Sequence, residues 1–77
     1  MNSIPNVERS PLSRRYSVDG ITVKVDIFRG SVELWWRLEV TSADDQVTEW
    51  TDTFATDGEA WDEFVYVVNT EGITVFD

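Results

Sequence analysis

Hydrophobic and polar side chains alternate along two stretches in the middle of the chain, and a period of two residues is typical of strands with one buried face. In residues 21–28 one side is formed by Ile21, Val23, Val25 and Ile27, and the other by Thr22, Lys24, Asp26 and Phe28. In residues 32–41 the apolar side is formed by Val32, Leu34, Trp36, Leu38 and Val40. The pattern predicts two adjacent strands joined by a short turn at residues 29–31.

A third, weaker strand is predicted at residues 47–54, after a polar turn at residues 42–46. Its large side chains, Trp50 and Phe54, share one side with polar residues. A strand with so little apolar surface suits the edge of a sheet.

Asp19-Gly20, just before the first alternating stretch, has two interpretations. The pair can form a two-residue hairpin turn, which would pair a short strand at residues 15–18 with the strand that follows. It can also form a bulge that resets the alternation. We favour the bulge.

A helix is predicted to begin at residue 57, because the sequence Thr56-Asp57-Gly58-Glu59 fits a capping box. An apolar stripe follows at helical spacing, formed by Trp61, Phe64, Val65 and Val68. Gly72 predicts the end of the helix, and residues 73–76 predict a short last strand.

The predicted fold class is therefore α+β, a small antiparallel β-meander with one helix packed on one face, in the order β-β-β-α-β. The last strand would run parallel to the first and third strands, beside one or the other. Residues 1–14 hold two prolines and show no periodicity, so we expect a flexible N-terminal arm there and a single domain over residues 15–77.

The net charge of −9 is unevenly distributed along the 77 residues. Residues 1–37 hold all six basic side chains and four acidic ones, whereas residues 38–77 hold eleven acidic side chains and no basic one. Direct nucleic-acid binding is disfavoured, because affinity for phosphates depends on Lys and Arg. A protein partner with a basic surface is the natural complement.

Catalysis has little support in the sequence. The chain has no histidine, no cysteine and a single lysine, so the usual activated nucleophiles are missing. Paired carboxylates could act on glycosides, but a sheet with one helix in so short a chain seldom encloses a substrate-sized cleft. We expect no enzymatic activity and no cofactor.

The acidic pairs could supply oxygen ligands to Ca²⁺ or Mg²⁺, but no EF-hand spacing is present, so we expect no metal site. The chain has no apolar run suited to a signal peptide or a membrane span, which makes a cytoplasmic location and no membrane contact the expectation.

Two surfaces are candidates for partner binding. The first is acidic and holds Asp44, Asp45, Glu49, Asp52, Asp57, Glu59, Asp62 and Glu63. Its charge is typical either of a docking surface or of a protein kept soluble or adapted to salt, and the sequence leaves both interpretations open.

The second candidate is aromatic. Trp35 and Trp36 are adjacent in an alternating stretch, so they should point to opposite faces, with Trp36 in the core under the helix. Trp35 could then join Phe28, and also Tyr16, in an exposed interface. Cation–π packing of Trp35 beneath Arg37 or Lys24 is the alternative.

The run Trp50-Thr-Asp-Thr-Phe-Ala-Thr-Asp-Gly-Glu-Ala-Trp-Asp-Glu-Phe64, followed by Glu71-Gly72-Ile73, resembles a strand-to-helix segment of small bacterial proteins of unassigned function. That resemblance implies no particular activity. In size and charge the chain also resembles phage-encoded inhibitors, including anti-CRISPR proteins and nucleic-acid mimics. The sequence thus favours a non-enzymatic acidic binding module that docks on a basic partner, and the alternative is a small homodimer joined through the open sheet face.

Overall fold

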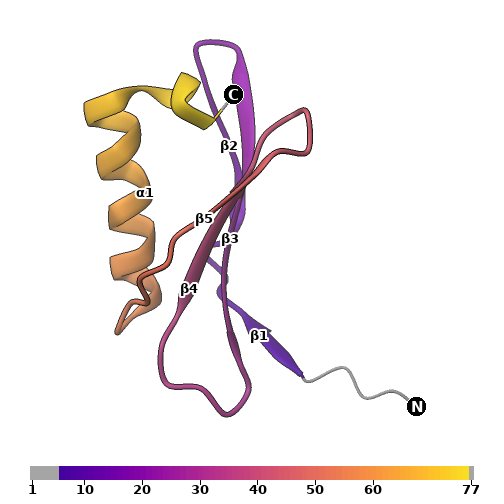
Figure 1. Cartoon of the computed structure of the whole chain (residues 1–77), viewed down its shortest axis with the longest axis vertical. Helices are drawn as coiled ribbons and strands as arrows, with labels where there is room; N and C mark the ends of the chain where they lie inside the picture. The colour runs from indigo at the N-terminus through magenta and orange to yellow at the C-terminus, as the bar shows by residue number, and fades with distance from the viewer. Residues whose placement is uncertain (1–5, 77) are drawn as a thin grey trace.

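The computed structural model describes residues 6–76, which form one antiparallel sheet with a helix on one face (Figure 1). The elements in chain order are β1 (Val7–Arg9), β2 (Arg14–Val18), β3 (Ile21–Gly30), β4 (Arg37–Thr41), β5 (Val47–Glu49), α1 (Asp57–Glu71) and the 3₁₀-helix η1 (Ile73–Phe76). The α+β class with one helix packed on a small antiparallel sheet is as the sequence predicts.

β3 is the central strand, and both of its edges are occupied. β4 lies along one edge. The other edge is shared, because β2 pairs with the first half of β3 and β1 pairs with its last three residues. The flexible arm predicted for residues 1–14 is therefore wrong for residues 7–9, which form a strand, and for Arg14, which begins β2. It is also wrong for the connection at residues 10–13, where Ser10 is buried and Ser10 and Ser13 are hydrogen-bonded to Ile27. Residues 1–5 lie outside the described residues.

Asp19 and Gly20 form the tight turn of the β2–β3 hairpin. Both residues have positive φ, 52° and 79°, which is the conformation of the two central residues in a type I′ turn. The strand at residues 15–18 is present within β2, so the bulge interpretation is wrong and the hairpin interpretation is correct.

The β3–β4 connection breaks the predicted alternation. The Glu33 carboxylate accepts a hydrogen bond from the Gly30 amide at 2.9 Å and another from Arg37 at 3.2 Å. The Gly30 amide, and secondarily Arg37, lower the pKa of the Glu33 carboxyl. Because this compact turn replaces the start of the second predicted strand, Val32 is 93% exposed and Leu34 is 75% exposed.

β5 is the edge strand beside β4, as predicted, but it ends at Glu49 rather than at residue 54. After β5 the backbone still forms isolated hydrogen bonds with β4 and with Trp36, the residue before β4. The Trp50 amide donates to the Leu38 carbonyl at 3.1 Å, and Trp36 and Phe54 exchange two backbone hydrogen bonds. The turn at residues 42–46 is also as predicted, with a hydrogen bond from the Ser42 amide to the Gln46 carbonyl at 2.9 Å.

α1 begins and ends where its caps predict. The Thr56 side chain accepts a hydrogen bond from the Glu59 amide at 3.1 Å, and the Glu59 carboxylate accepts one from the Ala55 amide at 3.2 Å. Gly72 closes the helix at a φ of 87°, a value that side chains rarely tolerate.

The core lies between α1 and the sheet. It is formed by Val23, Val25, Ile27, Trp36, Leu38, Val40, Ala60, Phe64, Val68, Ile73 and Phe76. The placement of Trp36 in the core is thus correct, since this side chain is 8% exposed. The sheet face away from α1, called the open face below, is covered by no other element among residues 6–76.

The predicted last strand, and with it the parallel pairing, is wrong. Residues 73–76 form η1, which places Ile73 and Phe76 on the same side of one turn, where both are buried in the core. All strand pairs among the described residues are antiparallel.

Candidate functional site

Three of the eight carboxylates predicted to form an acidic surface have structural roles inside the molecule. Asp57 is partly buried and accepts a hydrogen bond from the hydroxyl of Ser10 at 2.7 Å. Ser10 is itself buried, and its hydroxyl also accepts a hydrogen bond from the Leu12 amide. Asp57 therefore joins the segment between β1 and β2 to the start of α1.

Glu59 and Glu63 are the other two. Glu59 completes the helix cap described above, and the Glu63 carboxylate accepts a hydrogen bond from the indole nitrogen of Trp50 at 3.2 Å. This contact holds the segment after β5 against the side of α1. The capping box predicted the role of Glu59, but the sequence gave no sign of the roles of Asp57 and Glu63, because their partners are 47 and 13 residues away in the chain.

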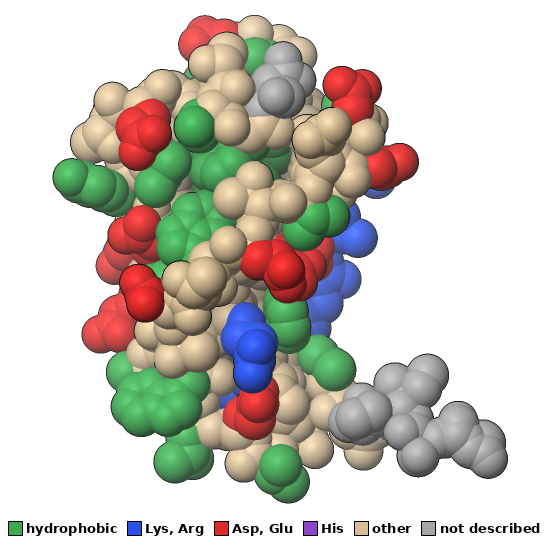
Figure 2. Space-filling view, in the orientation of Figure 1, with side chains coloured by type: hydrophobic (Ala, Val, Ile, Leu, Met, Phe, Trp, Pro, Cys, Tyr) green, Lys and Arg blue, Asp and Glu red, His purple; other side chains and the backbone are tan. Residues whose placement is uncertain are grey.

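The other five carboxylates are exposed and lie in separate places. Asp44 and Asp45 lie on the turn between β4 and β5, Glu49 lies on β5, Asp52 precedes α1, and Asp62 lies on α1. Figure 1 shows the β4–β5 turn and the start of α1 at different ends of the molecule. Figure 2 likewise shows acidic side chains scattered over this view rather than gathered into one patch.

The basic side chains compensate only the acids of the N-terminal half. The three ion pairs among residues 6–76 join Arg9 to Asp26, Arg29 to Glu8 and Arg37 to Glu33. Arg14 lies over the ring of Trp61, with its guanidinium carbon 5.4 Å from the ring centroid. No carboxylate of the described residues after position 37 takes part in an ion pair.

The open face carries charges in rows, because residues paired across antiparallel strands point to the same side. One row, the basic row, holds Arg15, Lys24, Thr41 and Val47. The next row along the strands, the acidic row, holds Asp26, Glu39 and Glu49. Sequence reasoning missed both rows, although Lys24, Asp26 and Glu39 stand on the polar sides of the two alternating stretches.

Glu39 lies in the middle of the acidic row, and its pKa is raised. Partial burial is the main cause, and a side-chain hydrogen bond with Glu49 and the negative charges of Glu49 and Asp26 act in the same direction. The ordinary response of a carboxyl beside other carboxylates is to hold its proton more tightly.

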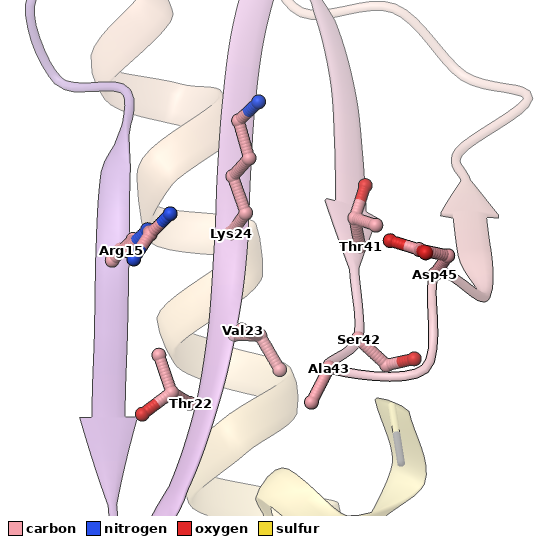
Figure 3. A pocket seen from close by; sticks show the side chains of 8 residues that line it. All are labelled: Arg15, Thr22, Val23, Lys24, Thr41, Ser42, Ala43 and Asp45. Carbon is pink, nitrogen blue, oxygen red and sulfur yellow. The ribbon is translucent and has the colours of Figure 1, made fainter.

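A depression of about 290 Å³ lies at the basic row. It is lined by Arg15, Thr22, Val23, Lys24, Thr41, Ser42, Ala43 and Asp45, and Figure 3 shows these side chains on β2, β3, the end of β4 and the turn that follows, with α1 behind the sheet.

The aromatic side chains predicted to form one interface line different depressions or lie on different sides of the sheet. Trp35 is 54% exposed and lines a depression with Leu34 and Thr53. Phe28 lies on the open face beside Val7. Tyr16 belongs to the opposite side of the sheet, where its ring packs edge-on against Phe64 at 5.1 Å, so its predicted place in the patch is wrong.

Cation–π contacts involve other tryptophans than the one predicted. Arg29 lies over the ring of Trp36 at 4.3 Å, and Arg14 lies over Trp61. For Trp35, neither Arg37 nor Lys24 forms such a contact among residues 6–76.

Within residues 6–76 no three acidic, histidine or cysteine side chains are grouped so that they could hold a metal ion. None of the helices in this part of the chain is long and apolar enough to cross a membrane. Comparison with known proteins gives no match to a family model, to a curated protein or to a solved structure.

Proposed function

We propose that this protein is a non-enzymatic binding module of the cytoplasm, whose exposed carboxylates dock on a basic surface of a protein partner. One observation carries the proposal: every ion pair of the described residues uses an acid from residues 1–37, so the described acids of the second half form no ion pair within the chain. A basic surface of a partner would supply the missing cations.

As docking groups we propose two pairs of exposed acids. One pair is Asp44 and Asp45 on the β4–β5 turn, and the other is Asp52 and Asp62 near the start of α1. Separated carboxylates on a rigid scaffold present charge as a phosphate backbone does, which makes a groove that otherwise holds nucleic acid a suitable partner surface. This mimicry is the more specific form of the proposal.

Two variants test the proposal and act as controls for each other, since each removes two exposed charges. They are Asp44→Asn with Asp45→Asn, and Asp52→Asn with Asp62→Asn. Glu63 and Asp57 stay unchanged because they hold the fold. Partners captured at low salt from the source cells are identified and purified, and the association rate of each is measured against salt concentration.

Complementary charge acts mainly on the encounter rate, so the variant that lies at the docking surface should associate several-fold more slowly, by about 3-fold or more, with a weaker dependence on salt. Competition by nucleic acid for the same partner would support mimicry. If both variants associate at the wild-type rate, or if association is indifferent to salt, the acids do not form the docking surface. Turnover of generic phosphoester or glycoside substrates would contradict the non-enzymatic part of the proposal.

A further inference from the structure

The open face combines two rows of like charge that lie next to each other. In the basic row Arg15 and Lys24 are direct cross-strand partners. In the acidic row Glu39 is the direct partner of both Asp26 and Glu49. Like charges placed directly opposite each other on neighbouring strands destabilise a sheet, so each row bears an electrostatic cost, which the Arg9–Asp26 ion pair offsets only in part for the acidic row.

The unpaired charges of the two rows are equal in number and opposite in sign. Asp26 already forms an ion pair with Arg9. The remaining four, Arg15, Lys24, Glu39 and Glu49, take part in no ion pair among residues 6–76. A surface that carries two free cations in one row and two free carboxylates in the next is complementary to itself.

We propose that a second copy of this chain docks on the open face, with the acidic row of each copy lying over the basic row of the other. The required symmetry is a two-fold axis that runs across the strands between the two rows, which are about 7 Å apart because two residues separate them along a strand. Such an axis exchanges the rows, and the interface is isologous, the commonest arrangement of soluble homo-oligomers.

This symmetry brings groups of opposite charge together. Lys24 of the second copy would lie over Asp26 and beside Glu39, and Glu39 of the second copy would lie over Thr41. Thr41 and Lys24 line the 290 Å³ depression in Figure 3, which gives that carboxylate a place to enter. The pKa of Glu39 is raised in the single chain. A cation of the second copy beside this carboxyl would favour its charged form.

Apolar side chains on the same face add to the contact. Val47 ends the basic row, and Phe28 stands in the row beyond the acidic one, between its cross-strand partners Arg9 and Arg37 and beside Val7. Sheets that pack face to face lie about 10 Å apart, which leaves room for these side chains and for the long charged ones. α1 and its exposed acids stay outside this interface, whereas Asp45, one of the proposed docking acids, lines the same depression. The inference is therefore independent of docking through Asp52 and Asp62.

Sedimentation velocity over a range of protein concentrations tests the inference with the protein itself as the ligand. We expect the 8.9 kDa chain to form a species of twice that mass, with a dissociation constant that rises with salt because charge pairs hold it together. Lys24→Glu and Glu39→Lys should each be monomeric, because each places like charges across the two-fold axis at both symmetric contacts.

An equimolar mixture of these two variants should recover a dimer. In that heterodimer residue 24 of one chain is acidic where residue 39 of the other is basic, and the second contact keeps the wild-type pair. A dimer formed through a different surface would not predict that two monomeric variants associate only with each other. Glu71→Lys is the matched control, because it makes the same substitution as Glu39→Lys at an exposed position of α1 and should dimerise as wild type does.

Circular dichroism and thermal melting of each variant establish that it is folded. Should a charge reversal unfold the chain, Lys24→Gln and Glu39→Gln remove the same contacts with less disturbance and should each weaken the dimer about tenfold or more. The inference is overturned if the wild type is monomeric at every concentration, if the single variants dimerise as wild type does, or if the mixture of folded variants stays monomeric.

Discussion

Trp35 and Trp36 are adjacent in the chain, but one side chain is exposed and the other is buried. Replacing each in turn by alanine compares the loss of the same side chain from the surface and from the core. Trp36 is 8% exposed and packs in the core, whereas Trp35 is 54% exposed at the β3–β4 connection. We therefore expect Trp36→Ala to destabilise the protein strongly and Trp35→Ala to change its stability little. Because the chain context is the same, Trp35→Ala is a matched control.

The magnitude for Trp36 follows from what its ring contacts. Truncation of a buried tryptophan costs about 3–5 kcal/mol, because transfer energy is lost and a cavity is left. Arg29 lies 4.3 Å from the ring centroid, and loss of that contact adds about 0.5–1 kcal/mol at a partly exposed site. A chain of 77 residues has a total stability of about 4–12 kcal/mol at the usual value per residue. Trp36→Ala should thus remove between about a third and all of it.

Urea unfolding followed by circular dichroism measures both variants, with Trp36→Phe as a milder change if Trp36→Ala does not fold. The midpoint should fall while the slope against urea stays constant, since a change of slope would indicate an altered unfolded state. For Trp35→Ala we expect less than about 1 kcal/mol, as for other surface substitutions. If Trp35→Ala costs more than Trp36→Ala, the assignment of the two rings to their environments is wrong.

Two further predictions concern the helix cap and the acidic row. Thr56→Ala should lower the free energy of unfolding by about 1 kcal/mol, because the Glu59 amide loses its acceptor. Urea unfolding measures this variant beside the exposed control Thr53→Ala. An equal loss of stability in the two variants would contradict the prediction. The raised pKa of Glu39 means that the folded state binds a proton more tightly than the unfolded state, so the stability from this group is present below about pH 4.5 and is lost as pH rises through the folded pKa. Glu39→Gln should therefore be at least as stable as wild type at pH 7, and the difference in stability should shrink on acidification. Urea titrations of the monomer at pH 7 and below about pH 4.5 measure this difference. An unchanged difference between the two pH values would show that Glu39 is not the group that titrates.

Local signals in the sequence were sufficient where the structure depends on neighbouring residues. The alternation in residues 21–28 predicted β3, and the Thr56–Glu59 cap together with Gly72 predicted both ends of α1. These elements follow from side-chain spacing and backbone caps, which act within a few residues. The burial of Phe64 and Val68 followed from the same helical spacing.

Tertiary pairing decided what local patterns left open. Residues 73–76 have the β-branched and aromatic side chains of a strand, but β1 and β2 occupy the edge of β3, one of the two places predicted for it, and η1 instead buries Ile73 and Phe76 together. Residues 7–9 have no periodicity of their own and become a strand because the far half of β3 offers them backbone partners.

For the charged surface, too, the sequence determined one part and the tertiary structure the other. The sequence by itself determined that the second half of the chain is acidic, because charge depends on composition alone. Only the tertiary structure decided that Asp57 and Glu63 hold the fold and that Lys24 and Glu39 stand in neighbouring rows of the open face. Which side chains become neighbours depends on strand register and on contacts between residues far apart in the chain, and neither is encoded in the spacing of a single segment.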